Sequence, residues 1–280
     1  MKKIMPVFFA LFVLTKAIGQ SDRAFADSLR TRFGIPELAY AVVSADSIIE
    51  MQISGVHRNN TEQIASLNDR FRIGSLTKTV TSYIAAVLVK QGKIQWNTKF
   101  FDLYPELKNR SDSGYYNLTL LDLITFRANL ISWSYDNTTP TKKKISGDAR
   151  QQRYLFTEWV LRQKPFSGNR TLFWSNPSYV AAGLMLEKAT VKPYESLVAE
   201  LGQVLDINFG FGQPNLLDEN QPWGHDEHLK PEIPANNYKL NWLSSAGNIN
   251  VSLPDYCRFI QMQLRGLLGR SELNESAVIR

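Results

Sequence analysis

The segment Phe71–Lys78 constrains this chain most, because it brings a serine and a lysine together at the start of an amphipathic helix. Beyond it, apolar residues recur with the spacing of one buried helical face, at Val80, Tyr83, Ile84, Val87 and Leu88. Gly92 then predicts the end of the helix. Ser75 and Lys78 therefore fall in the first turn, three residues apart on one face, where the lysine amine can reach the serine hydroxyl.

A serine with an amine in reach is a nucleophile with its own base. The unpaired N–H groups of a helix start favour the anionic species that form during acyl transfer. Ser75 is the only serine of the chain that is followed by lysine three residues later. The four-residue pattern alone is more typical of a helix-capping serine before a solvent-exposed lysine. The residues around the pattern distinguish a catalytic serine from a helix-capping one.

The longer stretch FRIGSLTKTVTSYIAAVLVKQGKI resembles the segment around the reactive serine of the β-lactamase-related serine hydrolases. This family includes penicillin-binding proteins, class C β-lactamases and related esterases. The resemblance implies an α+β fold of the β-lactamase/transpeptidase type, with an antiparallel sheet flanked by helices and a mostly helical lobe. It also implies that Ser75 forms an acyl-enzyme with Lys78 as base. The substrate would be a β-lactam, a D-amino-acid peptide or an ester, and no cofactor or metal is expected.

The second motif of this family is Tyr-x-Asn, in which the phenol shuttles a proton and the amide orients the substrate. The matching positions here are Trp174 and Asn176. An indole N–H donates a hydrogen bond but accepts no proton, so the role of base falls to Lys78. The resemblance leaves substrate binding to Asn176 and Trp174. Tyr115-Tyr116-Asn117 also fits the pattern, but it lies where the family has a loop, and we interpret it as a decoy.

The third motif of the family, His or Lys followed two residues later by Gly on an inner strand, is not found in this chain, and each of the three histidines lacks the glycine. In the family it comes after the helix that resembles residues 253–268. The same region of the family contains the strands that complete the sheet and one of the two N–H groups of the oxyanion hole. We therefore expect a family domain whose C-terminal strands are absent. Losing one oxyanion-hole donor costs about a hundredfold or more in rate, so the alternative function is an inactive remnant or binding protein on the same fold.

The N-terminus predicts a secretory signal peptide over residues 1–19, followed by the hydrolase domain over residues 20–280. Two lysines precede an apolar run, Ile4–Leu14, that is too short to span a membrane permanently. We expect an exported protein in the periplasm or the extracellular space. Half of the formal net charge of +6 comes from three leader lysines, Lys2, Lys3 and Lys16.

Little basic excess therefore remains for nucleic acid. The expected partner is a small-molecule or peptide substrate, with no nucleic acid and no permanent membrane span. Cys257 is the only cysteine, so an internal disulfide is excluded and the fold depends on its core. We expect this thiol to be buried in a helix and not to be catalytic.

The rest of the chain predicts a hairpin and further helices. Strand-like runs at 38–44 and 48–54 flank a polar turn. Helices are expected at 155–161, from Asn176 as cap, from Pro193 and over 253–268, and Thr119 and Asp122 have capping-box spacing. A two-stranded hairpin is marginal alone. We therefore expect exposed apolar strand surface and poor solubility.

A metal site is the third function that the sequence suggests. His225-Asp226-Glu227-His228 combines two histidines with two carboxylates, which could serve a metallohydrolase. Proline and glycine flank this stretch and no helix spaces the ligands, so we do not expect a metal there. His57 follows the second strand and is predicted to be a surface or hairpin-end residue.

Overall fold

The structure is a computed structural model that describes residues 22–134, 136–166, 172–233, 239 and 241–270. The predicted leader lies outside these residues. The chain divides into two compact units. Among the described residues, unit 1 comprises 22–70, 217–232 and 252–270, and unit 2 comprises 71–134, 136–166, 172–216, 233, 239 and 241–251. Within the described ranges, no helix is both long and apolar enough to cross a lipid bilayer.

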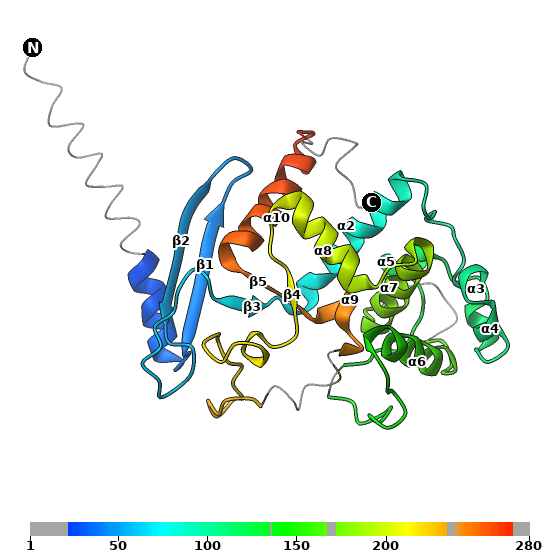
Figure 1. The fold of residues 1–280 in the computed structure, drawn as a ribbon, viewed down its shortest axis with the longest axis horizontal. Coiled ribbons are helices and arrows are strands. Elements are labelled where there is room, and N and C mark those ends of the chain that lie inside the picture. The colour runs from blue at the N-terminus through cyan, green and yellow to red at the C-terminus, as the bar shows by residue number, and fades with distance from the viewer. Residues whose placement is uncertain (1–21, 135, 167–171, 234–238, 240, 271–280) are drawn as a thin grey trace, which may run out of the picture. The chain divides into compact units, whose positions relative to one another are not determined.

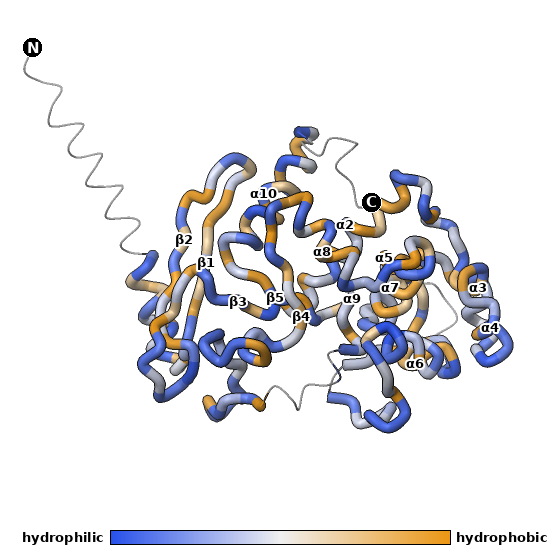
Figure 2. Tube along the Cα trace, viewed as in Figure 1, coloured by the Kyte–Doolittle hydropathy of each residue, from blue (hydrophilic) through white to orange (hydrophobic). Residues whose placement is uncertain are grey.

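Unit 1 is built on the predicted hairpin. Strand β1 (Glu37–Val43) pairs antiparallel with β2 (Ile48–Gly55), as Figure 1 shows. Figure 2 shows hydrophobic residues along the strands and hydrophilic residues at the turn between them. Helix α10 (Leu253–Leu267) contacts β1, and the Arg265 guanidinium donates a 2.9 Å hydrogen bond to the Ala45 carbonyl in the turn. Residues 22–32 form a further helix.

Unit 1 combines buried residues on helix α10 with exposed apolar residues on its hairpin. Helix α10 buries Cys257, as predicted, and it also buries Phe259. Val42, Ile48 and Ile49 on the hairpin stay 46 %, 40 % and 67 % exposed. The expectation of poor solubility is based on exposed apolar strand residues such as these. Poor solubility itself stays a prediction.

Unit 2 contains a small sheet with strand order β3-β5-β4. Its strands are β3 (Arg70–Arg72), β4 (Gly210–Phe211) and β5 (Ile249–Ser252). All four residues of β5 are buried. The Ile73 N–H donates a 3.0 Å hydrogen bond to the Ile249 carbonyl, so the sheet fixes the chain directly before the serine turn.

The remainder of unit 2 is mostly helical. Its helices are α2 (Thr77–Lys90), α3 (Phe100–Leu103), α4 (Pro105–Lys108), α5 (Leu120–Ile124), α6 (Ala149–Leu161), α7 (Asn176–Thr190), α8 (Tyr194–Leu205) and α9 (Ser244–Gly247). Helix α7 contacts α2, α3, α5, α6, α8 and α9, and every residue from Pro177 to Glu187 is buried. It is therefore the helix around which unit 2 packs. Helices with small antiparallel sheets agree with the predicted α+β class.

Helix starts were predicted with mixed success. The Thr119–Asp122 capping box is confirmed, with hydrogen bonds in both directions. Helix α6 begins earlier than predicted, because the Asp148 carboxylate accepts from the Gln151 N–H and caps it. The prediction that Asn176 caps α7 is wrong. Ser175 is the N-cap, and the Asn176 side chain is occupied elsewhere.

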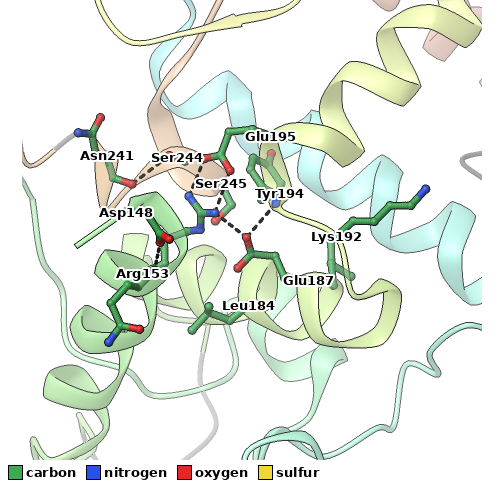
Figure 3. Close-up of polar contacts among 12 residues, drawn as sticks. Asp148, Arg153, Leu184, Glu187, Lys192, Tyr194, Glu195, Asn241, Ser244 and Ser245 are labelled. Carbon is green, nitrogen blue, oxygen red and sulfur yellow. Dashed lines mark hydrogen bonds and ion pairs between the residues drawn. The ribbon is translucent and has the colours of Figure 1, made fainter. Parts of the chain in front are cut away.

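A buried ion cluster fixes α6, α7 and α8 relative to one another (Figure 3). The guanidinium of Arg153 lies 2.5 Å from a Glu187 oxygen and 2.6 Å from a Glu195 oxygen. The same Glu187 oxygen accepts the Tyr194 N–H at 2.8 Å, where α8 begins. The side chains of Arg153 and Glu187 are completely enclosed. Each charge therefore depends on its partner.

Candidate functional site

Ser75 and Lys78 meet where a 3₁₀ turn runs into α2. The turn Gly74–Leu76 begins at a left-handed glycine with φ +51°, and α2 follows directly. Lys78 Nζ lies 3.0 Å from Ser75 Oγ, within hydrogen-bond distance as predicted. Ser75 is exposed, whereas Lys78 is only 4 % exposed. The hydroxyl is thus accessible while its neighbouring amine is enclosed.

Lys78 has three polar partners within unit 2. Besides Ser75 Oγ, its amine lies 2.8 Å from Asn176 Oδ1 and 2.6 Å from the Ala246 carbonyl oxygen. An ammonium group has three N–H donors, and this arrangement employs all of them. Burial lowers the pKa of Lys78 to about 8. At pH 7 about one amine in ten is therefore neutral, and the neutral fraction rises with pH.

The side chain of Asn176 is held on both sides. Its Nδ2 donates a 2.9 Å hydrogen bond to the Trp133 carbonyl, which turns Oδ1 toward Lys78. Ser175, the actual N-cap, donates from Oγ to the Ile131 carbonyl at 2.9 Å. The Asn176 side chain, in the first turn of α7, therefore accepts a hydrogen bond from Lys78 and does not cap the helix.

Helix α9 positions the third partner of Lys78. Thr81 Oγ1 donates to the Ser245 carbonyl at 2.7 Å and lies 2.6 Å from the Tyr194 hydroxyl. Ser245 Oγ donates to the Tyr179 carbonyl of α7 at 2.8 Å. These contacts fix α9 and with it the Ala246 carbonyl. Sequence reasoning missed this group, because a main-chain carbonyl leaves no residue-type signal.

Trp174 lies beside the lysine and forms part of an aromatic cluster. Lys78 Nζ is 5.1 Å from the centre of its ring, and the ring stacks on Phe126 with 4.8 Å between centroids. Trp174 itself is 54 % exposed. Phe126 adopts φ +57°, which is uncommon for a residue with a side chain, and it was not predicted as part of the site. An exposed aromatic face is therefore available next to Ser75 and Lys78.

Tyr179 does not replace the missing motif tyrosine. Its hydroxyl lies 3.0 Å from both the Ile124 carbonyl and Ser82 Oγ, and burial raises its pKa. The Tyr115-Tyr116-Asn117 stretch has other partners as well. The Tyr115 hydroxyl donates to the Asn129 carbonyl, and Asn117 Oδ1 accepts from Lys99.

The histidines lie in unit 1 and outside this site. His57 was predicted as a surface or hairpin-end residue: it does follow the hairpin strand β2, but it does not lie at the surface, since it is 8 % exposed and its Nε2 lies 2.9 Å from an Asp69 carboxylate oxygen. His225 Nε2 accepts the Asn59 N–H at 3.2 Å, and His228 is exposed. Among the described residues, the group whose side chains converge enough to hold a metal ion contains His57 but neither of the other two.

Comparisons with known proteins agree with the fold of both units. This protein is similar to the crystal structure of the D-alanine carboxypeptidase AmpC from Burkholderia cenocepacia, with a TM-score of 0.67 and 18 % sequence identity. The match covers 90 % of this chain and 65 % of the carboxypeptidase chain. The chain thus spans just under two thirds of that neighbour, and this likeness confirms the β-lactamase/transpeptidase-like α+β fold. The Beta-lactamase family model matches residues 23–278. Because that match covers more than half of the sequence, the chain belongs to the Beta-lactamase family.

Proposed function

We propose that this protein is a serine hydrolase that acts through an acyl-enzyme on Ser75. The observation that carries the proposal is the 3.0 Å approach of the exposed Ser75 hydroxyl to the buried Lys78 amine. A nucleophile within hydrogen-bond reach of a base whose pKa lies near neutrality is the arrangement that acyl transfer requires. Membership of the Beta-lactamase family supports the same chemistry.

The contacts of Lys78 orient it as a base. A neutral amine has two N–H groups and one lone pair. The Asn176 Oδ1 atom and the Ala246 carbonyl oxygen only accept hydrogen bonds, so they take the two N–H groups. The lone pair is then left facing Ser75 Oγ and can accept its proton.

The proposed reaction follows from this orientation. As Ser75 Oγ attacks the substrate carbonyl and forms the ester bond, its proton passes to Lys78. The resulting ammonium returns the proton to the leaving nitrogen or oxygen when the substrate bond breaks. Water then attacks the acyl-enzyme as it gives a proton to the same amine. The bond between the acyl carbon and Ser75 Oγ breaks, Lys78 returns the proton to Oγ, and the acid is released.

Asn176 and Trp174 are the proposed substrate-binding residues. One N–H of the Asn176 amide is engaged by Trp133, and the other can donate to the bound acyl group. The exposed face of Trp174 offers apolar contact to the substrate. The substrate is a β-lactam, a D-amino-acid peptide or an ester. The structural neighbour is a D-alanine carboxypeptidase, so a peptide ending in D-alanine is the first one to test.

We also propose that residues 1–19 direct export to the periplasm or the extracellular space, and that residues 20–280 belong to one hydrolase domain. The second candidate function is a binding protein without turnover on the same fold. Trp174 at the position of the motif tyrosine favours this alternative, because an indole cannot shuttle a proton. Covalent reactivity of Ser75 distinguishes the two.

The pH dependence of ester hydrolysis tests the proposed base. Only neutral Lys78 accepts a proton, and its pKa is lowered to about 8 by burial. Hydrolysis of p-nitrophenyl acetate should therefore rise about tenfold per pH unit below that pKa and level off above it. Ser75→Ala is the control and should show only background hydrolysis. A pH-independent rate, or an equal rate in Ser75→Ala, would contradict the proposal.

A further inference from the structure

Trp174 is held in place by the residues on either side of it. The Phe173 N–H donates a 2.8 Å hydrogen bond to the Phe126 carbonyl, and Ser175 Oγ donates to the Ile131 carbonyl at 2.9 Å. The indole itself stacks on the Phe126 ring, with 4.8 Å between centroids and 25° between the ring planes. Because the indole is already fixed, a ligand that stacks on it loses little additional conformational entropy.

One face of the indole is open. Phe126 covers a single face of the ring, and 54 % of Trp174 is exposed. A tryptophan that serves only to pack the interior is highly buried. A ring covered on both faces would expose little more than its edge. The uncovered face of Trp174 is therefore available to a bound molecule.

The distance to Lys78 indicates which part of a substrate meets this face. Lys78 Nζ lies 3.0 Å from Ser75 Oγ and 5.1 Å from the centre of the Trp174 ring. In the proposed reaction Lys78 gives a proton to the leaving nitrogen or oxygen, which must come within about 3 Å of Nζ to receive it. A ring bonded one carbon beyond the leaving atom can then reach the indole.

We propose that Trp174 determines specificity by selecting esters and amides whose leaving alcohol or amine carries an aromatic ring, an inference that rests on the acyl-enzyme function of Ser75. The ring of the leaving group would stack on the open indole face in the offset arrangement that aromatic pairs prefer.

The stacking acts on acylation alone. Ser75 Oγ bonds to the acyl carbon, the bond from that carbon to the leaving atom breaks, and the leaving atom takes the proton from Lys78. The leaving group has departed before water attacks the acyl-enzyme. Its contribution therefore enters kcat/KM and not the rate of deacylation.

Two esters of one acid test this inference in the full chain. Benzyl acetate and cyclohexylmethyl acetate form the same acyl-enzyme, but only the first has an aromatic leaving group. We expect the ratio of kcat/KM for the benzyl ester to that for the cyclohexylmethyl ester to fall about three- to tenfold in Trp174→Leu, because leucine keeps an apolar contact but cannot stack. Intrinsic differences between the esters cancel when this ratio is compared with that of the wild type.

Two further variants show whether the effect belongs to the aromatic ring. Trp174→Phe should keep most of the preference for the benzyl ester, since phenylalanine can also stack. Val204→Ala is the control and should leave the ratio unchanged, because Val204 is an exposed residue of α8 that has no part in the candidate site. Circular dichroism establishes that each variant is folded.

Protection of Ser75 from a fluorophosphonate gives a second readout that needs no turnover. Benzyl alcohol, the leaving group itself, should protect the wild type at a concentration about threefold or more below that needed for Trp174→Leu, whereas cyclohexylmethanol should protect both alike. An unchanged ester ratio or equal protection by benzyl alcohol in folded Trp174→Leu, while Ser75 still reacts, would overturn this inference alone. A wild type in which Ser75 is not labelled and neither ester is hydrolysed would overturn the proposed function with it.

Discussion

Replacing Lys78 with methionine is expected to slow acylation of Ser75 about a thousandfold, because the amine is the only described group within reach that can take the hydroxyl proton. Methionine keeps the length of the buried stem but removes the base. The measurement is the rate at which a fluorophosphonate labels the protein. Trp174→Phe is the matched variant, and it should keep the rate within about threefold, since an indole does no proton transfer.

The test depends on which of the two variants, Lys78→Met or Trp174→Phe, loses more of the labelling rate. Lys78→Met leaves Asn176 Oδ1 and the Ala246 carbonyl without a donor, so its thermal transition must be recorded beside that of the wild type. A folded Lys78→Met protein that labels normally would remove Lys78 from the mechanism. If Trp174→Phe suffers the larger loss, position 174 has a direct chemical role.

Arg153→Met is expected to lower the free energy of unfolding by about 3–5 kcal/mol, because it leaves the fully enclosed Glu187 carboxylate without its charge partner. Unfolding by urea, followed by far-UV circular dichroism, gives the value. Arg110→Met is the control. The Arg110 side chain is exposed and its partner Glu158 keeps a second ion pair with Arg162, so stability should change little. A double variant with Glu187→Gln should recover part of the loss.

Arg153→Met should also disturb the candidate functional site, because hydrogen bonds connect the ion cluster to it. Glu187 also accepts the Tyr194 N–H (Figure 3). The Tyr194 hydroxyl in turn contacts Thr81 Oγ1, which donates to the Ser245 carbonyl in α9. Equal stability of Arg153→Met and Arg110→Met would show that the cluster contributes no more than an exposed pair.

Local patterns predicted the parts of the fold that local physics determines. The hairpin, the buried face of α2 and the Thr119 capping box depend on residues a few positions apart, and all three are present. The reach of Lys78 to Ser75 belongs to the same class, since both lie within one turn.

The predictions that failed concern partners far away in the sequence. Asn176 reads as a cap from its neighbours, but its amide is recruited by Lys78, which lies 98 residues away. His57 does follow the hairpin, but its local sequence gives no sign that the side chain is buried beside Asp69. The Ala246 carbonyl is defined only by how α9 packs. Tertiary contacts therefore decided the role of these groups, and no spacing rule reports such contacts.

Mapping a covalent adduct tests the central claim most directly. The 280-residue protein is treated with a fluorophosphonate or a β-lactam, digested and analysed by mass spectrometry. We expect one adduct on the peptide that contains Ser75, and none on that peptide in Ser75→Ala. An adduct on another serine, or equal labelling of Ser75→Ala, would show that Ser75 is not the nucleophile.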